Sequence, residues 1–227
     1  MAWTKLTNGN CLEVLPKIEE ASVDFVLCDL PHGSSTSDIP LDILWNELHR
    51  VCKQDSVFCI FGTQPFTTTL ISSNLNEFRY NWIWQKESPT GHFNVAFCPM
   101  KLTEDICIFS KCTIGHLSKN PIRYNPQKVY KDSEKTLTYP TNILKFPRER
   151  HQIIHTQKPV DLLECLVKTY TDEGDVVLDC CMGSGSSGVA SMKSNRNFIG
   201  IEIDPKLFEV ASRRIESTRK EFEIFFL

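Results

Sequence analysis

Two short loops hold the residues of this chain that are best suited to chemistry. The first, Asp29-Leu30-Pro31-His32, offers a carboxylate, a backbone carbonyl next to a rigid proline ring, and an imidazole. The second, Gly183–Gly188, has glycine at its first, third and sixth positions, which permits a tight turn and close backbone approach to a nucleotide at a helix N-terminus. The two loops together indicate an enzyme that polarises a substrate with a carboxylate and binds a nucleoside-containing cofactor.

Each loop follows an apolar segment that is typical of a buried strand. Val23–Cys28 precedes the first loop and Val176–Leu178 precedes the second. In a doubly wound sheet, ligands bind outside the carboxyl ends of the strands, so loops at two such ends can share one cleft. The sequence therefore predicts an α/β fold whose site lies where these strands end.

The rest of the chain also alternates between strand and helix patterns. We predict further strands over residues 56–61, 79–85, 105–110 and 198–203. We predict helices over residues 40–51, 65–75, 160–171, 186–193 and 205–217. The apolar residues within 216–227 are expected to form either an edge strand or a dimer contact.

The composition is that of one globular domain with an insertion. The chain has 227 residues, 41% of them hydrophobic, and its N-terminus lacks a basic segment followed by an apolar stretch, so we expect a soluble, cytoplasmic protein without membrane contact. The ten cysteines are scattered through predicted strands and helices, which favours buried, reduced thiols. We expect no metal, because no zinc spacing is matched by the loose group Cys107, Cys112, His116, His151 and His155.

Basic residues are concentrated in one segment of a chain whose net charge is −3. Residues 110–158 hold ten Lys and Arg against three acids, whereas the remainder holds 15 against 25. Such a segment is either a solvated face or, beside a catalytic cleft, a surface that contacts phosphates. The candidates for phosphate contact are Arg123, Lys128, Arg148 and Arg150.

The glycine loop alone does not identify the cofactor. Asp179 precedes the loop and Glu202 ends the following predicted strand, where a carboxylate can accept hydrogen bonds from ribose hydroxyls. Both NAD and S-adenosylmethionine contain such a ribose. Fewer than 40 residues follow Gly188, so the other strands must come from the N-terminal part. This order predicts a circularly permuted sheet, which is unusual for an NAD oxidoreductase.

Several segments, in one consistent order, resemble a known family, the amino-methylating (N6-adenine or N4-cytosine) DNA methyltransferases of the permuted beta class. The resemblance is greatest to short phage-like and genomic-island members that carry leucine in an Asp-Leu-Pro-[Tyr/His] catalytic motif. The segments that carry it are Gly9–Leu12, Asp29–His32, Trp84–Lys86, Pro89–Gly91, Glu104–Ile106, His155–Pro159, Asp179–Gly185 and Gly200–Asp204.

The resemblance implies a fold and a division of the chain. The fold is a Rossmann-like methyltransferase fold that depends on S-adenosylmethionine, with a doubly wound, mostly parallel, seven-stranded sheet in circularly permuted order. Residues 1–110 form the catalytic half of the domain, 111–154 a loop-rich target-recognition insertion, and 155–227 the cofactor-binding half of the same domain.

The resemblance also implies a mechanism. Asp29 and the carbonyl of Leu30 accept hydrogen bonds from the exocyclic amine of a flipped base, Pro31 restricts the loop, and His32 stacks on the base. Asp29 favours adenine N6, because the N4-cytosine enzymes more often carry serine there. The residues expected to contact S-adenosylmethionine are Asn10, Cys11, Asp29, His155, Thr156, Gln157, Lys158, Asp179, Cys181, Gly183, Ser184, Gly185, Ser186, Ser187, Glu202 and Ile203.

Three positions depart from the family pattern and keep alternatives open. His32 replaces the usual tyrosine, Cys181 a common phenylalanine, and Asn10 a common aspartate. The alternatives are methylation of cytosine N4 or of RNA, a DNA-binding protein of the same fold with impaired catalysis, and, more distantly, an NAD oxidoreductase. Double-stranded DNA is the expected partner, with a homodimer and a companion restriction enzyme as further expectations.

Overall fold

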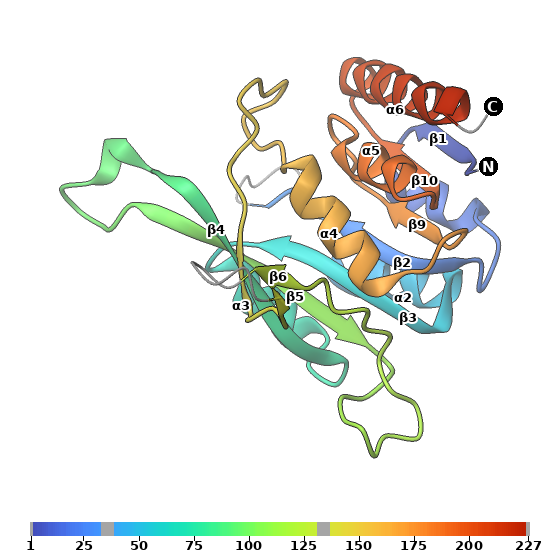
Figure 1. Ribbon diagram of the computed structural model, residues 1–227, viewed down its shortest axis with the longest axis horizontal. Helices are drawn as coiled ribbons and strands as arrows, with labels where there is room; N and C mark the ends of the chain where they lie inside the picture. The colour runs from blue at the N-terminus through green and yellow to red at the C-terminus, as the bar shows by residue number, and fades with distance from the viewer. Residues whose placement is uncertain (1, 33–38, 131–136, 226–227) are drawn as a thin grey trace.

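A mixed β-sheet forms the centre of the protein (Figure 1). The computed structural model describes residues 2–32, 39–130 and 137–225. Within them the sheet has eight strands in the order β1-β10-β9-β2-β3-β5-β4-β8. Their bounds are β1 Thr4–Asn8, β2 Val23–Cys28, β3 Cys52–Gly62, β4 Phe78–Thr90, β5 Lys101–Ser110, β8 Ile143–Lys145, β9 Val176–Asp179 and β10 Asn197–Glu202.

The strand directions divide the sheet into two parts. From β1 to β3 every neighbouring pair is parallel, whereas β5 pairs antiparallel with both β3 and β4. The strand β9 lies between β10 and β2, although it follows β2 by almost 150 residues in the sequence. The α/β sheet is therefore mostly parallel around β2 and β9, as predicted, and the two loops that follow these strands emerge at the same edge.

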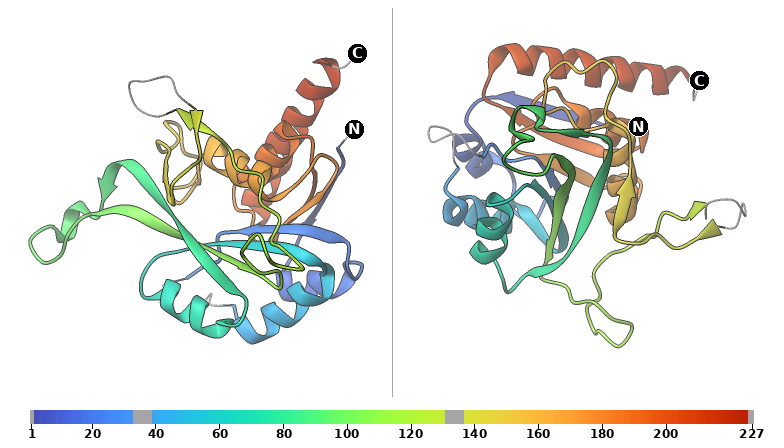
Figure 2. Two further views of the ribbon diagram at one scale, coloured as in Figure 1. Left: turned by 60° about the horizontal axis from the view of Figure 1, so that its bottom comes forward. Right: turned by 90° about the vertical axis from the view of Figure 1, so that its left-hand side faces the viewer.

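Helices cover both faces of the sheet (Figure 2). α4 (Val160–Tyr170), α5 (Ser186–Lys193) and α6 (Pro205–Phe225) pack on one face. The other face is covered by α1 (Cys11–Val14), η1 (Leu15–Lys17), α2 (Leu41–Val51) and α3 (Phe66–Ser73). This arrangement is the doubly wound architecture that the alternation of elements predicted.

Strand β2 is buried on both of its faces. Phe25 and Leu27 belong to the apolar cluster that includes α4, α5 and α6, whereas Val26 and Cys28 belong to the cluster on the side of α1, α2 and α3. Side chains alternate across a strand, so a central parallel strand reads as a continuous apolar run. The strand thereby fixes the position of the loop that begins at Asp29.

The predicted number of strands was wrong by one. The eighth strand, β8, pairs in parallel with β4 and comes from the segment 111–154, which we expected to be loop-rich. Leu144 of β8 is buried, and the indole of Trp84 donates a hydrogen bond of 2.8 Å to the carbonyl of Phe146. These contacts attach part of the predicted insertion to the sheet. The same segment also contains two short strands, β6 (Val129–Tyr130) and β7 (Leu137–Thr138), which pair antiparallel as a small ribbon.

The C-terminal segment also differs from the prediction. α6 extends to Phe225, so the residues after Ser217 form a helix rather than an edge strand as far as the described chain reaches. Glu216 pairs with Arg219 at 2.9 Å and with Lys220 at 3.6 Å, which are the i,i+3 and i,i+4 spacings that support a helix.

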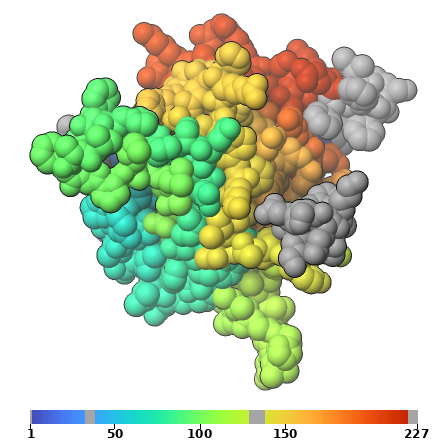
Figure 3. All heavy atoms as spheres, turned by 60° about the vertical axis from the view of Figure 1, so that its left-hand side comes forward, coloured from blue at the N-terminus to red at the C-terminus, as the bar shows by residue number. Residues whose placement is uncertain are grey.

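Two segments stand out from the body of the molecule. Figure 3 shows the hairpin of β4 and β5 (green) and the loop after β5 (yellow-green) projecting from it. A short helix, η2 (His92–Asn94), lies at the tip of the hairpin, where Phe93 and Phe97 are exposed. The second half of β4 reaches the candidate site, because Trp84, Lys86 and Thr90 line its cavity.

Candidate active site

The two loops identified in the sequence line one cavity of about 920 Å³. It lies at the carboxyl ends of β2, β9 and β10, and the segment Ile154–Lys158 before α4 forms another part of its wall. Its size is near the upper end of the range for small-molecule and cofactor sites. The cavity can therefore hold a cofactor and part of a second substrate together.

Asp29 directly follows β2 and is bound by a lysine. The Lys158 ammonium forms an ion pair with Asp29 Oδ2 and lies 3.4 Å from Glu104 Oε2. Glu104 in turn accepts an ion pair of 2.5 Å from Lys86. The loop carrying Lys158 and the strands β4 and β5 thus hold the predicted catalytic carboxylate from the side of the antiparallel strands.

The ion pairs keep Lys158 and Glu104 charged despite their burial. Burial alone would lower the pKa of Lys158, but the nearby carboxylates of Asp29 and Glu104 raise it above the ordinary value for lysine. Burial would raise the pKa of Glu104, but the charges of Lys158 and Lys86 hold it below the ordinary value. The site therefore presents alternating fixed charges next to Asp29.

His32 is positioned by its neighbours on two sides. Its Nδ1 lies 2.7 Å from the carbonyl oxygen of Leu30, and its Nε2 lies 3.4 Å from Oγ1 of Thr63. The imidazole stacks on the ring of Phe66, with centroids 4.5 Å apart and planes 5° apart. Phe66 and Thr63 were not among the predicted site residues. One helix and one strand separate them from His32 in the sequence, and no local pattern shows that they contact it.

The glycine loop begins α5 with its backbone turned into the left-handed region. Gly185 has φ +79° and precedes the first helical residue. A Cβ atom at Gly185 would lie 2.8 Å from the Cβ and 3.0 Å from the Cα of Ala211 in α6. Both the φ angle and the close approach of α6 therefore require glycine here.

Carboxylates organise the backbone around this loop. Glu202 Oε2 accepts a hydrogen bond of 2.8 Å from the amide of Gly183, and Oε1 accepts one of 2.8 Å from the amide of Asp204. Asp179 accepts from the Cys181 amide at 3.0 Å and from the Ser187 hydroxyl at 2.5 Å. Burial raises the pKa of Asp179 to about 6, although these hydrogen bonds oppose the shift.

The remaining predicted cofactor residues also line the cavity, with Gly185 beside it in the turn. They are Asn10, Cys11, His155, Thr156, Gln157, Lys158, Cys181, Ser184, Ser186 and Ile203. Arg214 of α6 was missed, and it donates hydrogen bonds to the carbonyl of Ser184 and, at 3.4 Å, to the hydroxyl of Ser186. It holds the glycine loop from behind, and nothing in the pattern of α6 distinguishes it from a surface arginine.

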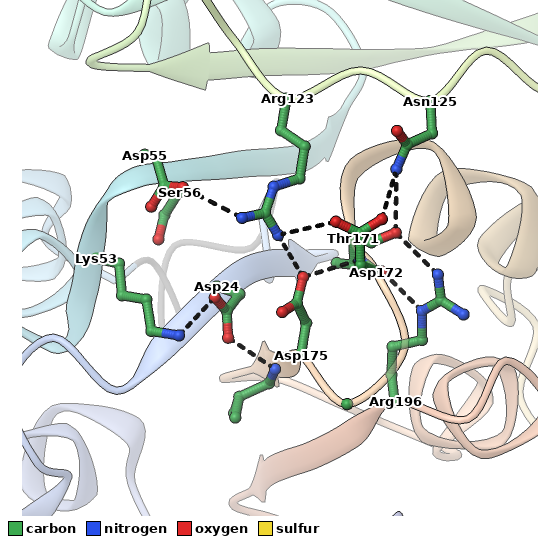
Figure 4. Close-up of polar contacts among 12 residues, drawn as sticks. Asp24, Lys53, Asp55, Ser56, Arg123, Asn125, Thr171, Asp172, Asp175 and Arg196 are labelled. Carbon is green, nitrogen blue, oxygen red and sulfur yellow. Dashed lines mark hydrogen bonds and ion pairs between the residues drawn. The ribbon is translucent and has the colours of Figure 1, made fainter. Parts of the chain in front are cut away.

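The four predicted phosphate-contact residues do not share one surface. Arg148 lines the cavity and donates a hydrogen bond of 3.4 Å to Ser88, and Lys128 and Arg150 are exposed. Arg123 lies at the opposite edge of the sheet, where it pairs with Asp175 just before β9 and, at 3.2 Å, with Asp55 (Figure 4).

The same edge holds Asp24, in the first half of β2. Its carboxylate forms an ion pair of 2.7 Å with the ammonium group of Lys53 (Figure 4). Asp24 and Asp29 thus mark opposite ends of β2. The number of charges along the sequence does not show at which end of the strands a residue lies. Arg123 was therefore grouped with Arg148 as a candidate for phosphate contact.

Comparison with known proteins places these features in a family. The family model N6_N4_Mtase, described as DNA methylase, matches residues 41–213. Type II methyltransferase M1.MboII of Moraxella bovis is 27% identical, with 92% of this chain and 95% of that protein aligned. DNA adenine methyltransferase YhdJ of Escherichia coli (strain K12) is 27% identical, with 93% and 82% aligned.

Solved structures share the fold. The complex of M1.HpyAVI with SAM has a TM-score of 0.69 at 22% identity and covers 93% of this chain and 98% of that one. The PvuII DNA methyltransferase (cytosine-N4-specific) has a TM-score of 0.74 at 15% identity, and the match covers 97% of this chain and 92% of that one.

In the part of the chain that the structure describes, none of the helices combines the length and apolar character needed to cross a membrane.

Proposed function

This chain belongs to the N6/N4 DNA methylase family, and from that premise we propose that it methylates N6 of adenine in double-stranded DNA with S-adenosylmethionine as the methyl donor. The observation that carries the proposal is the position of Asp29, which is held by Lys158 at the cavity that the glycine loop also lines. Asp29 at this position favours adenine over cytosine. Methylation of cytosine N4 is the alternative within the family.

The cavity residues fit the proposed donor. Glu202 lies at the cavity with both oxygens already engaged by backbone amides, which fixes its carboxylate for ribose hydroxyls. The segment His155–Lys158 and Asn10 would hold the methionine part, and Cys181 would lie beside the adenine. When bound, S-adenosylmethionine supplies an electrophilic methyl group on a sulfonium.

Asp29 and Leu30 would make the target amine nucleophilic. The lone pair of an exocyclic amine is delocalised into the ring, so the nitrogen attacks only when acceptors draw on its hydrogens. Lys158 contacts Oδ2 of Asp29, which leaves Oδ1 as the acceptor for one hydrogen. The carbonyl of Leu30 is the second acceptor, and it has two lone pairs, so its contact with His32 does not exclude the amine.

The fixed negative charge of Asp29 is expected to stabilise the positive charge that develops on the nitrogen as the methyl group is transferred. Asp29 then accepts the proton that the nitrogen must lose. Lys158 keeps Asp29 oriented through this step. No covalent bond between the chain and the base is needed.

His32 would stack on the flipped base. Phe66 supports one face of the imidazole in a nearly parallel stack, so the base would extend this stack on the other face. Arg148 in the cavity wall and the exposed Arg150 would contact phosphates. Arg123 is left out of this surface because it is paired at the opposite edge of the sheet.

The test is methyl transfer from labelled S-adenosylmethionine to unmethylated double-stranded DNA by the protein and by Asp29→Asn. The variant keeps the shape of the side chain but removes its charge, and we expect a loss of about 100-fold or more in the transfer rate. Calorimetry should show that Asp29→Asn still binds S-adenosylmethionine, so that the loss in transfer rate at a saturating concentration of the cofactor exceeds any loss in affinity.

A matched control is Asp24→Asn, at the other end of β2, where the carboxylate pairs with Lys53. We expect this variant to keep its activity at a temperature at which it is folded. Equal losses in the two variants, or full activity of Asp29→Asn, would overturn the proposed role of Asp29.

A further inference from the structure

Four cysteines from three separate segments converge at the wall of the cavity. Cys28 ends β2, Cys180 and Cys181 follow β9, and Cys11 begins α1. They are free thiols, and Cys28 and Cys180 are each only 2% exposed. Neither the proposed methyl transfer nor the packing of the sheet requires so many thiols in one place.

The spacing of the sulfur atoms suits a single cation. The Sγ atoms of Cys28, Cys180 and Cys181 all lie within 4.8 Å of one another, and those of Cys28 and Cys180 are 3.3 Å apart. Thiolates bound to one tetrahedral zinc ion at about 2.3 Å are separated by about 3.8 Å. Small movements of the side chains would therefore bring the three sulfurs to one ion. Cys11 also lines the cavity, but it does not belong to the group of sulfur atoms that lie within 4.8 Å of one another.

The three thiols are shielded from solvent. Cys28 and Cys180 are buried and Cys181 is partly buried, so water has little access to an ion that they bind. Among the residues that the structure describes, these cysteines are the group whose ligand atoms lie close enough to hold one metal ion.

We propose that Cys28, Cys180 and Cys181 form a binding site for a thiophilic divalent cation of the Zn²⁺ or Cd²⁺ class, which competes with the cofactor. Sulfur ligands without carboxylate or histidine select such soft ions. Each coordinating thiol gives up its proton, so binding through three sulfurs releases three protons and forms three metal–sulfur bonds. The bound cation would fix Cys181, which lines the cavity, and this competition rests on the proposed cofactor site.

The test is a titration of the reduced, metal-free protein with Cd²⁺ alone. We expect the ultraviolet sulfur-to-cadmium absorption band to saturate at one equivalent, and the band to be lost in Cys28→Ser and Cys180→Ser. Cys181→Ser is a second variant, because this side chain is only partly buried and its replacement disturbs the core least. Thermal melting checks that each variant folds.

Cys98→Ser is the matched control, because it removes an exposed thiol that is not among the residues lining the cavity. It should leave the band and the stoichiometry unchanged. A band that is lost in Cys98→Ser, or that persists when Cys28, Cys180 or Cys181 is replaced, would overturn the site.

Calorimetry of S-adenosylmethionine with and without one equivalent of Cd²⁺ tests the competition. We expect at least a tenfold loss of affinity when Cd²⁺ is present, and unchanged affinity would overturn this part. If S-adenosylmethionine does not bind even the metal-free protein, the proposed cofactor site fails, whereas the Cd²⁺ titration still decides the thiol site.

Discussion

Replacing Gly185 by alanine tests how closely α6 packs against the glycine loop. Gly185 has φ +79°, and an added Cβ would lie 2.8 Å from the Cβ of Ala211. Ala211 is completely buried, and its Cα would be only 3.0 Å from the new atom, so the contact cannot be relieved by turning a side chain. Either α6 or the loop must move.

Two costs add at this position. An L-residue in the left-handed region costs roughly 1–2 kcal/mol. Forcing an extra carbon into a packed contact typically costs about 1–3 kcal/mol more. We therefore expect Gly185→Ala to lower the free energy of unfolding by about 3 kcal/mol. We also expect it to weaken S-adenosylmethionine binding, because it displaces the glycine loop that we propose contacts the cofactor.

Gly174→Ala separates these two costs. Gly174 has a similar φ of +85°, but a Cβ added there would meet no atom of the described chain within 4 Å beyond its own neighbours in sequence, so it carries the conformational cost alone. Urea denaturation should show a loss of about 1–2 kcal/mol, and calorimetry an unchanged cofactor affinity. Equal destabilisation by the two substitutions would show that contact with α6 is not the reason for glycine at position 185.

Three further changes give separate expectations. Lys158→Met leaves Asp29 without its ammonium partner and should lower the free energy of unfolding in urea by about 2 kcal/mol, less than for a fully buried pair because Asp29 is partly exposed. Arg148→Met should weaken DNA binding and reduce the slope of log affinity against log salt by about one, whereas Arg123→Met should change neither, in a filter-binding series. Burial raises the pKa of Asp179 from 3.8 to about 6, so the folded state binds this proton more tightly than the unfolded state does. The free energy of unfolding therefore falls as pH rises from 3.8 to about 6. Asp179→Asn should remove this contribution to the pH dependence when denaturation is measured at several pH values.

Each of these expectations has a contrary result. Unchanged stability of Lys158→Met would mean that solvent already compensates Asp29. Equal effects of Arg123→Met and Arg148→Met on the salt slope would contradict the assignment of the two arginines to opposite edges of the sheet. A variant without Asp179 that keeps the full slope between pH 3.8 and about 6 would place the proton elsewhere.

The sequence was most informative where a local pattern decides the structure. The apolar run of β2 predicted a buried strand, and all six of its residues are buried. The loop after it was expected to share a cleft with the glycine loop, and the common cavity confirms this. The glycine spacing predicted a helix start, and α5 begins directly after Gly185.

Features that depend on long-range contacts were not predictable. β8 has three residues and pairs with β4 from 53 or more positions away, so its existence depends on contacts such as that between Trp84 and Phe146. The partner of Asp29 is equally distant, since Lys158 lies 129 residues further along the chain. The resemblance predicted that Lys158 lies near the cofactor, but only the fold brings its charge to Asp29.

Some missed features had a usable signal. The end of α6 was predicted too early because the apolar residues after Ser217 favoured an edge strand or a dimer contact. The pairs of Glu216 with Arg219 and Lys220 have helical spacing and could have extended the helix. By contrast, the pairing of Arg123 with Asp175 and Asp55 has no local signature, and the basic segment alone could not separate Arg123 from the arginine that lines the cavity.

The most direct test of the central claim is the identity of the modified base. Unmethylated double-stranded DNA would be incubated with the protein and S-adenosylmethionine, digested to nucleosides and analysed by mass spectrometry, with Asp29→Asn in parallel. We expect N6-methyladenine from the wild-type chain and a loss of about 100-fold or more in the variant. N4-methylcytosine would contradict the proposed target, and methylation that persists undiminished in Asp29→Asn would contradict the mechanism.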